Sequence, residues 1–210
     1  MLVTGMSEDE ILQEIKEDIP NVLALSDVRD NKVRRIVLKS VLFPVYLHSF
    51  VTTRRKNNWI ILWEAKSKKN VGDNALITFV CYQDTKVGKY AFMPTWESGE
   101  LILIVYPPHF FQRFAERMNM NLTGIDLIRR YFERNSSYCF NIKREESEGC
   151  TYHHIYGSCK EGAAMGLVVP YKRIYLFKTF ITYDMCKGKQ IEDFAKSEQL
   201  RKEIHEKLPY

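Results

Sequence analysis

Apolar residues recur along this chain at helical spacing in some segments and in short strand-like runs in others. Together the two patterns predict an α+β protein. Near the start, apolar residues recur at helical spacing from Ser7 to Pro20, and Ser7 followed by Glu10 fits a capping box at the helix start. The helical spacing returns from Asp30 to about Phe43. The first part of the chain is therefore predicted to be a pair of helices.

Runs of β-branched and aromatic residues separated by turn-forming residues come next, and they predict consecutive antiparallel strands. These runs are Val45–Thr53, Trp59–Ala65, Ala75–Tyr82, Lys89–Pro94 and Leu101–Tyr106. Pro107 and Pro108 then end the last strand and begin a helix that runs to about Met120, because proline is accepted in the first turn of a helix. A second capping box, Thr123 with Asp126, predicts the helix that follows.

The second half of the chain closes with further strands and one helix. The strands are expected at Ser137–Lys143, Thr151–Tyr156, Met165–Val169 and Arg173–Thr182. The last of these runs is almost continuously apolar, which is typical of a strand covered on both faces. A final helix is expected from about Gln190 to Lys207.

The predicted architecture is an N-terminal helical pair, a curved and mainly antiparallel sheet, a strand–helix–helix–strands unit and a C-terminal helix. Residues 1–44 form the N-terminal helical segment and residues 45–210 form the α+β core. The 210 residues suit one compact domain of this kind.

Composition supports a globular protein, with 45% hydrophobic and 27% charged residues. Apolar runs such as Leu101–Tyr106 are far shorter than the ~20 residues of a membrane-spanning helix. The chain begins without a basic segment followed by an apolar one, so no secretory signal is visible. The five cysteines form no CxxC pair and are expected to be reduced. We therefore expect a cytoplasmic protein with no membrane partner.

The charges are distributed unevenly. Residues 1–30 hold eight acids and two bases, a balance of −6, whereas residues 31–70 hold ten bases and one acid, Glu64, a balance of +9. Such asymmetry is compatible with an anionic partner. It is also compatible with a basic surface that the N-terminal segment and solvent neutralise.

The segment from Pro107 to Arg117 contains the main candidates for catalytic residues. On a helix turning ~100° per residue, four polar side chains share one face, opposite a row of phenylalanines. These four are His109, Arg113, Glu116 and Arg117. An imidazole near a helix N-terminus tends to be neutral and can take up a proton, and two arginines one turn apart suit phosphate oxygens. The alternative is structural, with Glu116 paired to an arginine on its own helix.

The arrangement His-x-x-x-Arg-x-x-x-Arg after a strand, followed by a second helix and strands, resembles short toxin-type domains of the RelE/BrnT ribonuclease kind. The resemblance extends loosely over residues 100–200 and implies an RNA-facing sheet beside a helix that contributes His109, Arg113 and Arg117. The chain departs from those domains in its greater length, its N-terminal helices and five additional strands. Another bacterial family of undetermined function would show the same pattern.

A second candidate region combines Arg54, Arg55 and Lys56 with Trp59. Basic side chains beside an aromatic ring suit nucleic acid, because the basic side chains contact phosphates and the aromatic ring stacks on a nucleobase. Lysines at positions 66, 68 and 69 add to this charge. Lysine-rich loops are also ordinary at sheet edges, where they discourage aggregation.

Metal binding and cofactor binding receive less support. Cys150, His153 and Cys159 are ligand types that zinc accepts, but their spacing is not that of a zinc knuckle or ribbon, so we predict no metal. The chain has no HExxH, P-loop, GxGxxG or GxSxG motif, and no cofactor is expected.

Two functional hypotheses follow from the sequence, and they leave open whether the protein is an enzyme. In the first, it interacts with RNA and carries a metal-independent, ribonuclease-like acid–base site at His109. In the second, it is a non-catalytic binding or regulatory module that docks a protein partner through residues 1–44. The first requires ionisable groups that converge at one place, and the second requires exposed apolar side chains near the N-terminal helices.

Overall fold

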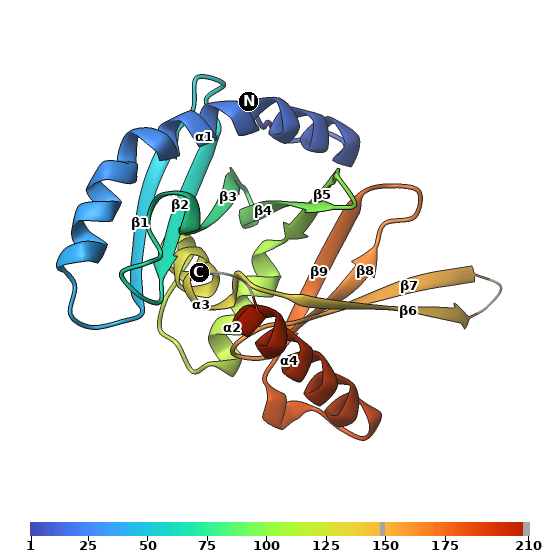
Figure 1. The fold of residues 1–210 in the computed structure, drawn as a ribbon. Coiled ribbons are helices and arrows are strands. Elements are labelled where there is room, and N and C mark those ends of the chain that lie inside the picture. The colour runs from blue at the N-terminus through green and yellow to red at the C-terminus, as the bar shows by residue number, and fades with distance from the viewer. Residues whose placement is uncertain (148–149, 208–210) are drawn as a thin grey trace. The chain divides into compact units, whose positions relative to one another are not determined.

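The computed structural model describes residues 1–147 and 150–207 (Figure 1). The described residues form four α-helices and nine strands, most of them paired antiparallel, so the predicted α+β class is confirmed. The chain divides into two units: unit 1 contains residues 1–85, and unit 2 begins at Lys86. The predicted division after residue 44 lies inside unit 1, between its helix and its first strand.

The N-terminal region of unit 1 is one helix, α1 (Glu8–Lys39), so the predicted helical pair is wrong. The capping box at its start is confirmed, because Ser7 Oγ accepts from the Glu10 N–H and the Glu10 carboxylate accepts from the Ser7 N–H. Pro20 lies inside α1 although it lacks the N–H that would bond to the preceding turn. The buried face continues past it, which explains why the helix does not stop there. Its members are Glu14, Ile15, Asp18, Val22, Ser26, Val33 and Val37.

The sheet of unit 1 has three antiparallel strands in the order β1 (Val45–Thr52), β2 (Asn58–Ala65) and β3 (Leu76–Thr85). A 3-10 turn at Gly72–Asn74 precedes β3. β2 lies in the middle, and its five residues 59–63 are all buried. Helix α1 packs against β1 and β2.

A buried carboxylate joins α1 to the loop between β1 and β2. Asp18 is completely buried, and its Oδ2 accepts hydrogen bonds from Thr53 Oγ1 at 2.7 Å, Asn57 Nδ2 at 2.8 Å and Trp59 Nε1 at 2.8 Å. Its Oδ1 accepts from Asn21 Nδ2 at 3.1 Å. Four donors therefore compensate for the removal of this carboxylate from water.

The sheet of unit 2 has six strands in the order β4 (Gly88–Glu97), β5 (Glu100–Tyr106), β9 (Ile174–Ile181), β8 (Ala163–Val168), β7 (Cys150–Ser158) and β6 (Cys139–Ser147). β5 and β9 are parallel, and the other paired strands of this unit are antiparallel. The predicted strand–helix–helix–strands unit is present, because α2 (Pro108–Arg117) and α3 (Gly124–Asn135) lie between β5 and β6 in the chain.

Two features of the helices in unit 2 differ from what the sequence pattern predicts. Thr123 is the N-cap of α3, but its side chain makes no capping hydrogen bond, so the second predicted capping box is wrong. The closing helix, α4 (Lys189–Lys207), follows a 3-10 turn at Tyr183–Met185 that the sequence pattern did not indicate.

The core of unit 2 is aromatic and is organised around Tyr106 at the end of β5. The ring of Tyr106 has five aromatic neighbours at centroid distances of 5.1–6.0 Å, and most of them meet it edge to face. These neighbours are Phe110 and Phe111 of α2, Tyr131 and Phe132 of α3, and Phe177 of β9. The cluster holds both helices on the sheet, since each buried aromatic ring contributes roughly 2 kcal/mol or more through its apolar area.

We expect Asp18→Asn to lower the free energy of unfolding by about 3 kcal/mol. The substitution removes the charge and places an NH2 group where three donors converge, so buried donors lose their acceptor. Urea unfolding followed by circular dichroism measures the effect. Asp27→Asn is the matched control, because Asp27 is exposed on the same helix. Equal stability of the two variants would contradict the anchoring role of Asp18.

Candidate functional site

Helix α2 is anchored as its sequence predicts. Phe110, Phe111 and Phe114 are buried, whereas His109 and Arg113 are exposed. Pro108 stands in the first turn of the helix, after Pro107 as the N-cap. The phenylalanines therefore fix α2 on unit 2 and leave its polar face outward.

The four polar residues of α2 do not converge on one point. Arg113 Nη1 donates to Glu116 Oε2 at 2.9 Å, and both side chains are more than half exposed. Arg117 Nη1 donates instead to Thr179 Oγ1 on β9, at 2.9 Å. His109 makes no hydrogen bond or ion pair with the described residues. Each of these contacts is an ordinary surface interaction, and the catalytic assignment of the four residues stays a prediction.

Two of the four residues proposed to bind nucleic acid are engaged by acidic side chains of α1. Trp59 is fully buried and donates its indole N–H to Asp18, so neither face of its ring is open to a nucleobase. Arg55 forms two hydrogen bonds with Glu14, at 3.0 and 2.6 Å, and an ion pair with Glu17 at 2.8 Å. Arg54 and Lys56 are exposed. The sequence pattern could not separate these roles, because the three acidic partners lie on a helix about 40 residues earlier in the chain.

Glu14 is held in its charged form by these contacts. The guanidinium of Arg55, with smaller contributions from the amino group of Met1 and the amide of Asn57, lowers the pKa of Glu14 from 4.5 to about 2. Burial of the carboxyl acts in the opposite direction. Glu14 and Asp18 lie one helical turn apart, and both accept hydrogen bonds from polar side chains of the β1–β2 loop.

Two of the candidate metal ligands of unit 2, Cys159 and His153, lie in different surroundings. Cys159 is buried and its thiol donates to the carbonyl oxygen of Gly162 at 3.2 Å, whereas His153 is exposed. His154 pairs with Glu145 at 3.1 Å. The side chain of Cys150 lies outside the described residues, and within the described part of the chain no three His, Cys, Asp or Glu side chains gather to hold a metal ion.

The surface at the C-terminal end of α1 differs from the sites predicted from the sequence. Asp18 contacts Thr53 and Arg29 Nε donates to Ser49 Oγ at 2.9 Å, so α1 runs along β1 toward the beginning of that strand. β1 begins at Val45, which is opposite Ala65, the last residue of β2. The end of α1 and the loop after β2 therefore meet at the same end of unit 1.

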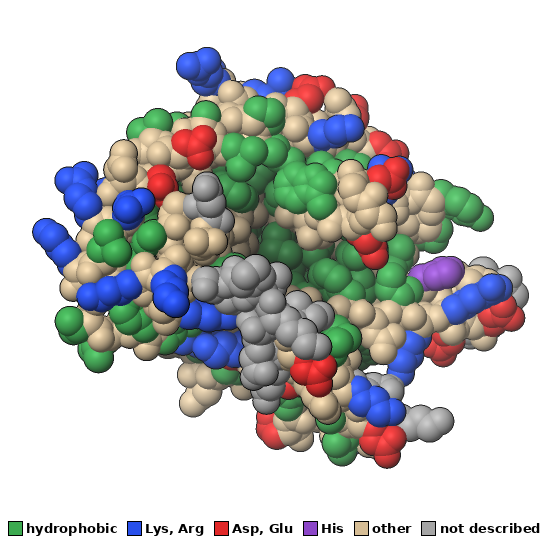
Figure 2. All heavy atoms as spheres, viewed as in Figure 1, with side chains coloured by type: hydrophobic (Ala, Val, Ile, Leu, Met, Phe, Trp, Pro, Cys, Tyr) green, Lys and Arg blue, Asp and Glu red, His purple; other side chains and the backbone are tan. Residues whose placement is uncertain are grey.

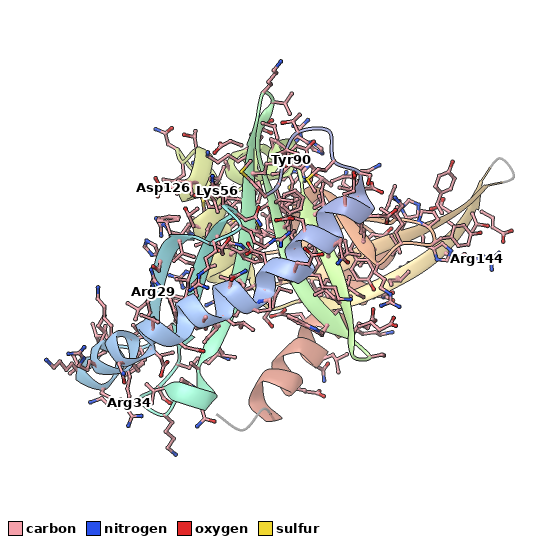
Figure 3. All side chains as sticks on the ribbon, turned by 90° about the horizontal axis from the view of Figure 1, so that it is seen from above. Arg29, Arg34, Lys56, Tyr90, Asp126 and Arg144 are labelled. Atoms are coloured by element: carbon pink, nitrogen blue, oxygen red, sulfur yellow. The ribbon has the colours of Figure 1, made fainter. Side chains whose placement is uncertain are left out.

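This end of unit 1 gathers basic and apolar side chains, and we call it the basic–apolar end. Its basic members lie on α1 and in the loop after β2: Lys32, Arg35, Lys39, Lys66, Lys68 and Lys69. Its apolar members are Val28, 78% exposed, and Val41 and Leu42, 87% and 83% exposed. Figure 2 shows Lys and Arg side chains together with hydrophobic ones at the left of the view, and Figure 3 labels Arg29 and Arg34 toward this end of α1.

The sequence pattern identified the bases of this surface but not its apolar residues. The sequence pattern predicts a helix from Asp30 to about Phe43, which includes Val41. The helix ends instead at Lys39, with Ser40 as its C-cap. The residues after Ser40 therefore leave the buried face, and the apolar pair at positions 41 and 42 becomes exposed.

Comparisons of the chain with models of known protein families, with curated proteins and with solved structures find no match. Within the described residues, no helix combines the length and the apolar character needed to cross a membrane.

We expect acid to destabilise the wild-type protein more steeply than the variant Glu14→Gln. Because the pKa of Glu14 falls from 4.5 to about 2 on folding, its contribution is complete above pH 4.5 and is lost as the pH falls toward 2. The variant has no carboxyl to protonate there. Urea midpoints measured through this pH range test the difference, and Glu116→Gln is the control, because Glu116 is an exposed glutamate of α2. Parallel pH profiles for the wild type and Glu14→Gln would contradict it.

Proposed function

We propose that this protein is a non-catalytic binding module that docks another protein through the basic–apolar end of unit 1. The observation that carries the proposal is the exposure of Val41 and Leu42, which are 87% and 83% accessible to solvent beside the C-terminus of α1. Val28 extends the apolar surface along α1.

Exposed aliphatic side chains of this kind are typical of the centre of a protein interface. Burying one valine or leucine side chain contributes roughly 1.5–3 kcal/mol. An apolar centre with a charged rim is the usual organisation of a contact between proteins. Lys39 at the end of α1, and Lys68 and Lys69 in the loop after β2, supply charge at the same end of unit 1 as Val41 and Leu42.

A protein partner fits this surface better than RNA does. Single-stranded RNA is held by stacking of its bases on aromatic rings and by contacts to phosphates. The aromatic ring that the sequence offered for stacking, Trp59, is fully buried. The exposed apolar side chains of this surface are aliphatic, and they suit the apolar side chains of another protein.

RNA cleavage at His109 receives less support from the contacts of α2. A general acid–base site needs its ionisable groups within reach of one substrate atom. Arg113 is paired with Glu116, and Arg117 is bonded to Thr179 on β9. The two arginines thus have separate partners, and the enzymatic hypothesis stays a prediction.

Site-specific photo-crosslinking tests the docking surface. With the photoreactive amino acid p-benzoylphenylalanine in place of Val28 or Val41, irradiation of cells that produce the protein is expected to yield an adduct of one size with another protein. Val87 is the matched control, because it is a valine 71% exposed in unit 2. Leu42→Ser is expected to reduce the adduct formed from position 41 at least about tenfold, since it removes most of one apolar contact.

Three outcomes would contradict the proposal. The first is the absence of a protein adduct at positions 28 and 41. The second is the same adduct at position 87 as at those positions. The third is an adduct from position 41 that Leu42→Ser leaves unchanged. Because the substituted side chains are exposed, the variants should keep the wild-type circular dichroism and urea midpoint.

The enzymatic alternative has its own test. We expect the purified protein to leave a mixed RNA substrate uncut, and His109→Ala to behave as the wild type in a gel assay over a range of pH. An imidazole without a second positioned group supplies little acid–base catalysis. Cleavage by the wild type that disappears in His109→Ala and in Arg117→Ala would establish the enzymatic hypothesis instead.

A further inference from the structure

The bases of α1 at its C-terminal end form a single row. Lys32, Arg35 and Lys39 are spaced by three and four residues, which places them on one face of the helix. All three are exposed, and the row spans roughly 10 Å at 1.5 Å per residue. Val28, four residues before Lys32, continues the same row and is 78% exposed.

The row has an apolar residue at each end. Val28 precedes it, and Val41 and Leu42 follow it after Ser40, the C-cap of the helix. Lys68 and Lys69, in the loop after β2, add positive charge at the same end of unit 1. Along the surface of α1 and the residues after it, an apolar side chain is therefore followed by basic side chains and then by apolar ones.

The bases are not neutralised by acids of the same helix segment. From residue 31 to the end of α1 the chain contains no Asp or Glu, although it contains Lys32, Arg34, Arg35 and Lys39. Arg35 Nε donates to the carbonyl oxygen of Asn31, so this guanidinium is oriented along the helix surface. The acids of the N-terminal half of α1 have other contacts, such as those of Glu14 and Glu17 with Arg55.

We propose that the segment which docks on the basic–apolar end is acidic, with aliphatic side chains on both sides of a row of carboxylates. This inference rests on the proposed function, and it adds the chemical class of the partner. Carboxylates would pair with Lys32, Arg35 and Lys39, and the aliphatic side chains would cover Val28, Val41 and Leu42. Complementary charge would accelerate the encounter and exclude basic partners.

A matched set of synthetic peptides tests this recognition. The probe is a fluorescein-labelled peptide with leucines at helical spacing and glutamates between them, and its two companions carry glutamine or lysine in place of glutamate. We expect the wild type to bind the glutamate peptide at least about tenfold more tightly than the glutamine peptide, as measured by fluorescence anisotropy. The difference should shrink as salt is added, because exposed charges are screened.

Charge reversal gives the sharper comparison. The variant Lys32→Glu/Arg35→Glu/Lys39→Glu is expected to lose the preference for the glutamate peptide and to prefer the lysine peptide. The control variant Lys16→Glu/Arg54→Glu/Lys56→Glu makes the same change in net charge at three exposed bases of unit 1 outside the row. It should keep the wild-type preference, which separates local recognition from net charge. Circular dichroism verifies that both variants are folded.

Each result separates this inference from the proposed function. Equal binding of the glutamate and glutamine peptides, or equal effects of the two triple variants, would overturn the acidic partner. Binding of an RNA oligonucleotide that only the Lys32/Arg35/Lys39 variant loses, with no peptide bound, would make this surface a nucleic-acid site. Photo-crosslinking at Val41 that persists in the Lys32/Arg35/Lys39 variant would overturn the acidic partner and keep the docking surface.

Discussion

The arrangement of unit 1 depends on the carboxylate of Asp18, which is completely buried and accepts four hydrogen bonds from side chains. Three of its donors, Thr53, Asn57 and Trp59, lie in the β1–β2 loop and at the start of β2, about 35–41 residues later in the chain. A buried carboxylate tolerates few alternative arrangements, because any displacement leaves a charge without a donor. The interaction therefore fixes where α1 lies along β1, and that placement brings the C-terminal end of the helix to the loop after β2.

The same constraint explains why the basic residues of unit 1 have different roles. Arg55 belongs to the loop that Asp18 and Glu14 hold, and its guanidinium is paired with two acids of α1. The row at Lys32, Arg35 and Lys39 lies where α1 has no acids left. A net charge of +9 over residues 31–70 therefore combines bases that stabilise the fold with bases that face solvent. Only the second group can recruit an anionic partner.

Local sequence patterns predicted most elements but not the contacts between them. All nine strands and α2, α3 and α4 were expected within a few residues, because turn residues and apolar periodicity are local signals. Pro20 was interpreted as a helix end, yet the buried face from Ile15 to Val22 continues across it. Trp59 follows a run of basic residues and was therefore a candidate for stacking on a nucleobase, and its partner Asp18 could not be identified from the pattern. Burial of a polar group depends on a distant donor or acceptor, which a single sequence does not reveal.

The exposed pair Val41 and Leu42 shows how a small change in a helix end alters a surface. Val41 stands four residues after the buried Val37, so one further turn of helix would continue the apolar face. Ser40 ends the helix first: its hydroxyl and its N–H both donate to the carbonyl oxygen of Ile36. The same N–H also donates to the carbonyl oxygen of Val37, which would otherwise lack a donor at the end of the helix. The apolar residues that follow are left outside the core and beside the row of bases. The exposed apolar residues of the basic–apolar end thus originate in the end of one helix, whose position the buried carboxylate of Asp18 determines.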